Sequence, residues 1–348
     1  MSICYYNETM RFFYNLSSKD SSESISETDL YIALVFGAIC CLLIFLCNAM
    51  IIIAVVRNRQ FHFPFYYLLA NLAAADIFAS LAYTFLMFHT GQISKTLTVH
   101  RYFLRQALLD VSFSASMYSL LVIAIERYFS VMKMMLHSNL SKRRVCCLIL
   151  VIWAAAVFMS TIPNMGWHCI CNTSTCSSLA PIYSRSFLVF WAIFNLSTFC
   201  IIVAIYLRIY MYVRKKTLNL SSHTTGSIKR SKMPMKLIKT IVVVLGAFIF
   251  CWTPGLIVVL LDGLHCTSCK VLAVKKWVLL LALINSLMNP IIYSYKDHEM
   301  WQAMKQMLCV GSKNKVETQQ DASKSTSTRH SVISENADLA NNHYHRGF

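Results

Sequence analysis

Seven stretches of the sequence are each long and apolar enough to cross a lipid bilayer. They are residues 31–56, 63–88, 102–134, 145–167, 187–207, 240–261 and 277–295. A bilayer core of about 30 Å requires roughly 20 apolar residues in a helix. The composition agrees, because 57% of the residues are hydrophobic and 14% are charged, whereas soluble domains have about 25% charged residues. We therefore predict an all-α membrane protein, built as a seven-transmembrane helix bundle.

The basic clusters predict how the bundle is oriented. They follow the first span (Arg57, Arg59), separate the third from the fourth (Lys142 to Arg144) and separate the fifth from the sixth (Arg214 to Lys236). Basic loops stay in the cytosol, so the amino terminus is expected outside and the carboxyl terminus inside. The net charge of +17 is explained by these clusters, and we predict no nucleic-acid partner.

Four segments follow from this topology: an extracellular segment 1–29, the bundle 30–295, an amphipathic membrane-surface helix 296–309 and a disordered cytoplasmic tail 310–348. The first segment has no stretch of signal-peptide length. Its Asn7 and Asn15 lie in glycan-acceptor motifs. The membrane-surface helix ends at Cys309, which is either palmitoylated or unmodified. The tail is polar and rich in Ser, Thr and Asn.

Polar residues at membrane depth are costly and therefore suggest function. Asp76 lies in the second span, and its expected partners in other spans are Asn48, Ser116, Asn285 and Asn289. Two readings stay open for Asp76. It is either a hydrogen-bonded structural carboxylate or part of a sodium site that favours the resting state.

Six motifs, in order along the spans, resemble the rhodopsin-like G-protein-coupled receptors. They are Asn48, Leu72 to Asp76, Glu126-Arg127-Tyr128, Trp153, Cys251 to Pro254, and Asn289 to Tyr293. The resemblance implies that heterotrimeric G proteins bind near Arg127 and that Asp76, Tyr293 and their neighbours take part in activation. It also implies that arrestin binds the phosphorylated tail. Prolines within the last two spans permit kinks and hinge motion.

The sequence departs from that class at Tyr102, where most members have a cysteine that is bonded to the second extracellular loop. Six cysteines lie in the predicted loops or in the amino-terminal segment, and sequence alone allows fifteen pairings of six cysteines. The chain is similar to the lysophosphatidic acid receptors in Phe61 to Pro64, Tyr66 to Asn71, Leu104 to Gln106 and Leu245 to Phe248, and residues 177–191 look most like their subtype three. This resemblance implies the disulfides Cys4–Cys171, Cys169–Cys176 and Cys266–Cys269.

Positive charge on the outer side suits a lysophosphatidate, whose phosphate carries a charge of about −1.5 to −2. Arg105 is our first choice for the phosphate because a guanidinium binds phosphate oxygens in a bidentate pair. The alternative is that Arg105 extends to the lipid headgroups. Three further residues match phosphate contacts of the family, and two cations are auxiliary candidates. These five are Lys276, Lys19, Tyr14, Arg185 and Lys275.

Gln106 is the residue expected to select the ligand. The related sphingosine 1-phosphate receptors have glutamate there, which suits an ammonium, whereas a neutral amide suits the hydroxyl of lysophosphatidate. Asp110, one turn deeper, is expected to contact the same headgroup region or to orient Arg105. The candidates for the acyl-chain wall, which ordinary core packing would explain equally well, are Trp191, Trp252, Leu109 and Leu279.

The rival functions are less well supported. The sequence shows no nucleophile–base pair, no metal-ligand cluster and no internal repeat of the kind found in transporters. We therefore predict a receptor, not an enzyme, with no cofactor apart from a sodium ion at Asp76. The resemblance implies coupling to the Gq and Gi classes, which raises calcium and lowers cAMP. A receptor for sphingosine 1-phosphate or another lysophospholipid is the alternative, and a transporter is a distant one.

Overall fold

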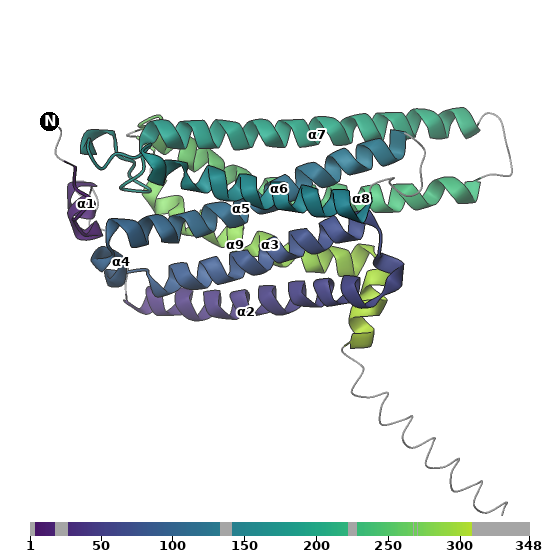
Figure 1. Cartoon of the computed structure of the whole chain (residues 1–348), viewed down its shortest axis with the longest axis horizontal. Coiled ribbons are helices and arrows are strands. Elements are labelled where there is room, and N and C mark those ends of the chain that lie inside the picture. The colour runs from purple at the N-terminus through teal and green to yellow at the C-terminus, as the bar shows by residue number, and fades with distance from the viewer. Residues whose placement is uncertain are drawn as a thin grey trace, which may run out of the picture. The chain divides into compact units, whose positions relative to one another are not determined.

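The computed structural model describes residues 4–17, 27–132, 141–221, 228–266, 268, 269 and 271–307. Within these ranges seven helices are long and apolar enough to cross a membrane, which confirms the predicted fold (Figure 1). They are α2 (Glu27–Arg57), α3 (Pro64–Phe88), α5 (Val99–Met132), α6 (Lys142–Thr161), α7 (Arg185–Ser221), α8 (Ile228–Gly263) and α9 (Val271–Lys296). Two short helices, α1 (Met10–Ser17) and α4 (Gln92–Thr96), lie together at one end.

The long helices pack side by side, and α5 has the central position. Helix α5 contacts α3, α6, α7 and α8, while α9 contacts α8, α2 and α3 and so closes the bundle. The outward faces carry exposed apolar side chains such as Leu42 on α2, Leu150 on α6 and Phe250 on α8. In lipid this exposure has no penalty, because the surrounding hydrocarbon is as apolar as the side chains.

Small and polar residues hold α3, α5 and α6 together. Ala75, Ala115 and Ala156 share one buried cluster, and small side chains let helix backbones approach closely. Asn71 on α3 donates to the Ser119 hydroxyl on α5 at 2.8 Å and accepts from the indole N–H of Trp153 on α6 at 2.9 Å. The amide of Asn71 therefore links all three helices at a point where water is excluded.

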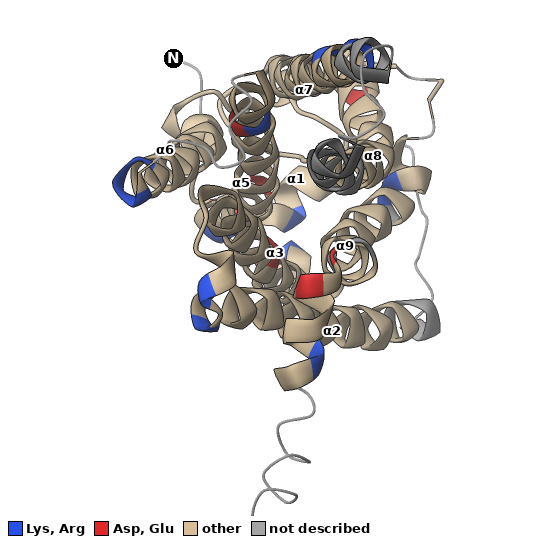
Figure 2. Ribbon diagram, turned by 90° about the vertical axis from the view of Figure 1, so that its right-hand side faces the viewer, with Lys and Arg blue, Asp and Glu red and all other residues tan. Residues whose placement is uncertain are grey.

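The end of the bundle opposite α1 carries basic residues at several helix ends (Figure 2). Helix α2 ends at Arg57, and α6 begins with three exposed cations, Lys142 to Arg144. At this end, the helices that contain the fifth and sixth predicted spans, 187–207 and 240–261, extend beyond those spans. Helix α7 continues to Ser221 and α8 begins at Ile228, because Lys and Arg are good helix formers and need not end a helix where it leaves the apolar layer.

Two compact units divide the chain, residues Met1–Met300 and Trp301–Phe348. The first contains the bundle. The stretch 298–307 is helical, inside the predicted segment 296–309. Cys309 and the tail 310–348 lie outside the described residues.

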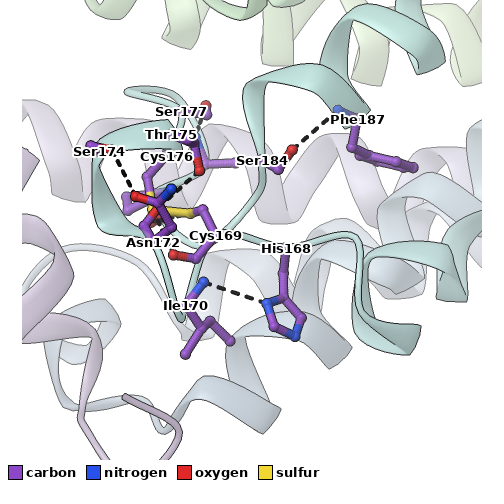
Figure 3. Close-up of a disulfide and its surroundings, with 12 residues drawn as sticks. His168, Cys169, Ile170, Asn172, Ser174, Thr175, Cys176, Ser177, Ser184 and Phe187 are labelled. Carbon is purple, nitrogen blue, oxygen red and sulfur yellow. Dashed lines mark hydrogen bonds between the residues drawn. A yellow bond between two sulfur atoms is a disulfide. The ribbon is translucent and has the colours of Figure 1, made fainter. Parts of the chain in front are cut away.

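Three disulfides cross-link the segments at the α1 end: Cys4–Cys171, Cys169–Cys176 and Cys266–Cys269. They are the same pairs that the resemblance implied. The first ties the amino-terminal segment to the loop between α6 and α7, and the second closes a small ring within that loop (Figure 3). Disulfides persist in oxidising surroundings, so their position agrees with an extracellular location for this end.

His168 fixes the start of the same loop. Its Nδ1 accepts from the backbone N–H of Ile170 at 3.4 Å, as Figure 3 shows, and its Nε2 lies 2.7 Å from the Tyr6 hydroxyl. Burial lowers the pKa of His168, which favours the neutral ring that Nδ1 needs in order to accept. The backbone of Tyr5 also donates to the Ile170 carbonyl at 3.4 Å. These two hydrogen bonds and the Cys4–Cys171 disulfide hold the amino-terminal segment against the loop between α6 and α7.

Candidate functional site

Arg105 is a cation buried near the α1 end of α5, with 5% of its surface exposed. Its Nη1 donates to the His89 carbonyl at 2.8 Å and to the Ser94 hydroxyl at 3.1 Å. Its guanidinium carbon lies 4.4 Å from the ring centroid of Tyr102, in cation–π range. Among the described residues no carboxylate forms an ion pair with Arg105, and its buried Nε makes no hydrogen bond. Buried charges are normally paired, so this guanidinium can accept an anionic ligand.

Tyr14 and Lys275 bring two further polar groups to Arg105. The Tyr14 hydroxyl lies 3.0 Å from the Ser94 hydroxyl, and Lys275 donates to the Leu179 carbonyl at 2.9 Å. Burial opposes ionisation of the Tyr14 phenol, but the Lys275 ammonium, the hydrogen bond with Ser94 and the Arg105 guanidinium together lower the pKa of Tyr14 below its usual value. Positive potential therefore outweighs burial at this phenol, as a site for an anion requires.

The loop between α6 and α7 adds a phenol, and α5 adds an amide. Burial, and next the carboxylate of Asp110, raise the pKa of Tyr183 well above its usual value, so its hydroxyl stays protonated at neutral pH. Gln106 lies one helical turn before Asp110, on the same face of α5. Its amide forms no hydrogen bond with another described residue, and its side chain is partly buried. The Tyr183 hydroxyl and the Gln106 amide therefore add neutral hydrogen-bonding groups to the part of the site that contains Arg105.

An apolar layer lies deeper along the same helices. Three of the four predicted wall residues, Leu109, Trp252 and Leu279, pack in one cluster with Tyr83. Trp191 is outside that cluster. It reaches Trp252 through Phe113, whose ring centroid lies 5.2 Å from that of Trp191 and 4.2 Å from that of Trp252. A cationic group above an apolar layer is the arrangement expected for a lipid with an anionic head.

Comparison with known proteins agrees with this geometry. Residues 47–293 match the family described as 7 transmembrane receptor (rhodopsin family). The chain is 60% identical to human lysophosphatidic acid receptor 3 over 317 residues, which are 91% of this chain and 90% of that protein. The chain therefore belongs to the lysophosphatidic acid receptors of the rhodopsin family. The resemblance found in the sequence motifs is confirmed.

Two other relatives show how far the similarity to this receptor extends. Mouse lysophosphatidic acid receptor 3 is 58% identical over 331 residues, 95% of this chain and 93% of the relative. Human lysophosphatidic acid receptor 1 is 52% identical over 307 residues, 88% of this chain and 84% of the relative. The higher identity to subtype three agrees with the prediction from residues 177–191.

The middle of the receptor contains the polar group around Asp76. The Asp76 side chain is fully buried and accepts from the Asn289 amide at 2.7 Å through Oδ2. Its Oδ1 has no hydrogen-bond partner among the described residues, and the same holds for Oδ1 of Asn48 and of Asn285. Ser116 is also buried. The predicted partners are thus all interior, and three oxygens of the group, one on Asp76 and two on its partners, have no hydrogen-bond partner among the described residues.

At the opposite end of the receptor, Glu126 and Arg127 form a bidentate ion pair through Nε and Nη2, one edge of the guanidinium. The Arg127 guanidinium carbon also lies 4.5 Å from the ring centroid of Phe65 on α3. This ring is a second contact of the arginine side chain, in addition to Glu126. Phe65 of α3 therefore packs against Arg127, and Tyr128, the next residue, is partly buried.

The other predicted residues are distributed as follows. Asn7 and Asn15 are exposed, as glycan acceptors must be, and Arg185 begins α7 with a buried Nε that has no hydrogen-bond partner among the described residues. The side chains of Lys276 and Tyr293, and the whole of Lys19, lie outside what the structure describes. Lys275 precedes the predicted seventh span, 277–295, but lies inside α9, which begins at Val271. The hydrogen bond to the Leu179 carbonyl uses one of the three donors of the Lys275 ammonium.

Asp262, near the end of α8, is an important residue that the sequence reasoning missed. It is 5% exposed, and its carboxylate accepts from the Ser177 hydroxyl and from the backbone N–H groups of Ser178 at 3.1 Å and Leu179 at 3.4 Å. The next residue, Gly263, has no room for a side chain, because an added Cβ would lie 2.7 Å from Val189. The sequence contained a sign of this role, because an acidic residue so close to an apolar span is unusual. Asp262 was not selected because the predicted span ended one residue before it.

The Asp262 contacts predict a local effect of Asp262→Asn in the receptor. The substitution removes the charge and replaces one acceptor oxygen by a donor, so the loop at residues 177–179 loses about 1.4 kcal/mol or more of local stability. We expect amide hydrogen exchange in 176–184 to be at least about tenfold faster, measured by mass spectrometry on detergent-solubilised receptor. Glu8→Gln, which changes an exposed acid at the same end, is the control. Unchanged exchange in Asp262→Asn would contradict the idea that the Asp262 carboxylate holds this loop in place.

Proposed function

We propose that this chain is a plasma-membrane receptor for lysophosphatidic acid, with its amino terminus outside the cell. The observation that carries the proposal is the buried Arg105, which has no carboxylate partner among the described residues, beside Tyr14 and Lys275. A phosphate monoester supplies the missing negative charge. The acyl chain then reaches the layer of Leu109, Trp252 and Leu279, where burial contributes about 0.8 kcal/mol per CH₂ group.

Signal transmission in this proposal is a shift between two populations of the bundle. Phe113 contacts both Trp191 and Trp252, so a lipid that displaces either indole changes packing on α8. Movement of α8 opens the cytosolic end and releases Arg127 from Glu126 and Phe65 for the G protein. We propose coupling to the Gq and Gi classes, with arrestin binding after phosphorylation of the tail.

A sodium ion at Asp76 is part of the same proposal. Carboxylate and amide oxygens are hard ligands, and the unsatisfied Oδ1 atoms of Asp76, Asn48 and Asn285 suit a small cation. The ion favours the resting state because it is held between several helices that must move on activation. These residues would bind the ion, whose positive charge would balance the charge of the Asp76 carboxylate.

A lysophospholipid panel tests the proposed function. Cells that express the chain are given lysophosphatidate, the monoacylglycerol with the same acyl chain, and sphingosine 1-phosphate, while calcium and cAMP are recorded. We expect lysophosphatidate to be at least about 100-fold more potent than the monoacylglycerol, because loss of a buried charge pair costs about 3 kcal/mol. A response to sphingosine 1-phosphate alone would favour the alternative receptor, and no response to any of the three would reject the proposal.

A further inference from the structure

Ser94 is a buried serine at which three separate segments meet. It lies in α4, is 7% exposed, and its hydroxyl is 3.1 Å from Nη1 of Arg105 on α5 and 3.0 Å from the hydroxyl of Tyr14 on α1. Gly91, just before α4, has φ 65°, a left-handed conformation that glycine adopts without strain. The turn at Gly91 directs the chain back over the bundle, and Ser94 is thereby placed between the two ligand-site candidates.

The hydrogen bonds of Arg105 determine which of its edges remains free. Nη1 has two hydrogens, and they are used by the His89 carbonyl at 2.8 Å and the Ser94 hydroxyl at 3.1 Å. Nε has no partner among the described residues. A phosphate pairs with guanidinium N–H groups, and Nε is the donor of Arg105 that remains without a partner for the anion among the described residues. Ser94 therefore helps to fix the orientation of the guanidinium before the ligand arrives.

The same hydroxyl also positions Tyr14. A serine hydroxyl has one donor and two acceptor sites, so it can accept from Arg105 and still bond the Tyr14 phenol. Tyr14 belongs to α1, which is anchored to the segment after α4 by the bond from the Met10 N–H to the Leu97 carbonyl at 2.9 Å. Without Ser94 the phenol would keep its backbone anchor and its interactions with Arg105 and Tyr102, but it would lose the hydroxyl that links it to Nη1 of Arg105.

We propose that Ser94 is a positioning residue for the lipid phosphate, acting through Arg105 and Tyr14 and not by touching the phosphate itself. The inference rests on the proposed function, because it specifies how the anion site of that receptor is organised. Preorganisation of this kind reduces the cost of ordering side chains when the ligand binds. Its loss should therefore weaken binding of the phosphate without changing the signalling state that the bound lipid produces.

The test compares Ser94→Ala with Ser94→Thr in cells that express the full-length chain, using lysophosphatidate and a calcium readout. Ser94→Ala should raise the EC50 roughly 10- to 30-fold, as expected for loss of a hydrogen bond to a charged group, while the maximal response is kept. Ser94→Thr retains the hydroxyl and should stay within about threefold of the parent chain. Surface staining of each variant, and competition binding on membranes, separate weaker binding from poorer expression.

A double-mutant cycle distinguishes positioning from general structural support. If Ser94 acts partly through the Tyr14 hydroxyl, Ser94→Ala combined with Tyr14→Phe should weaken lysophosphatidate binding by less than the product of the single effects. Strict multiplicativity would contradict the link to Tyr14, and a Ser94→Thr variant as weak as Ser94→Ala would contradict the role of the hydroxyl.

The outcomes also separate this inference from the proposed function. If the parent chain does not respond to lysophosphatidate, or if Arg105→Ala responds normally, the phosphate site itself is rejected. If both of these behave as proposed and Ser94→Ala matches the parent chain within about threefold, the positioning role alone is rejected.

Discussion

Replacing Arg105 by alanine is expected to abolish the response to lysophosphatidate at ordinary lipid concentrations. The guanidinium is buried, and among the described residues it has no carboxylate partner and its Nε has no hydrogen-bond partner. Truncating one partner of a buried, hydrogen-bonded charge pair costs about 2–5 kcal/mol. The corresponding loss of potency is roughly 30- to several-thousand-fold, and it should appear in EC50 curves for calcium release with the receptor still present at the cell surface.

Two matched variants make the Arg105 result specific. Arg101 lies one turn earlier on α5 and is exposed, so Arg101→Ala removes the same charge from the same helix outside the site and should have little effect. Arg105→Lys keeps the charge but loses the planar fork, and an intermediate potency is expected. If Arg105→Ala kept the parent potency while Arg101→Ala lost it, the phosphate would bind nearer the surface, as in the headgroup-contact alternative for Arg105.

The fold could be predicted from sequence because length and apolarity decide it. A stretch such as 31–56 has no alternative in water or in lipid other than a membrane helix, and the structure has α2 there. The positions of helix ends could not be predicted in the same way. Lys275 and Asp262 both lie inside helices that were predicted to exclude them, because tertiary hydrogen bonds at Leu179 and Ser177 compensate for the charge.

A residue of the candidate site could be predicted where its charge is costly near the membrane, but not where its residue type is common in loops. Arg105 could be selected because a cation near an apolar span requires a reason. Ser94 could not, since serine is common in loops and nothing in the sequence between Gly91 and Arg105 shows that the chain turns back over α5. The role of Ser94 depends on its contacts with Tyr14 and Arg105, which lie 80 and 11 residues away in the sequence.

The second large effect is expected from replacing Gln106, the residue predicted to select which lipid the chain recognises. Its amide forms no hydrogen bond with another described residue and lies one turn before Asp110. A neutral amide can donate to and accept from the hydroxyl of lysophosphatidate, but it cannot balance the ammonium of sphingosine 1-phosphate. An unpaired charge in a buried site is penalised by several kcal/mol, so the parent chain should discriminate against the ammonium lipid.

Gln106→Glu should therefore change the ligand preference and not merely reduce the response. The new carboxylate pairs with the ammonium of sphingosine 1-phosphate and lacks the donor that the hydroxyl of lysophosphatidate used, so the ratio of the two EC50 values should move by about 100-fold or more. Gln106→Ala is the control, because it removes the amide without adding charge and should weaken lysophosphatidate while leaving sphingosine 1-phosphate inactive. Both lipids are titrated against the same cells with a calcium readout. If the EC50 ratio in Gln106→Glu equalled that of Gln106→Ala, the ammonium would be excluded by some other residue, and Asp110, the neighbouring acid on the same face of α5, would be the next to replace.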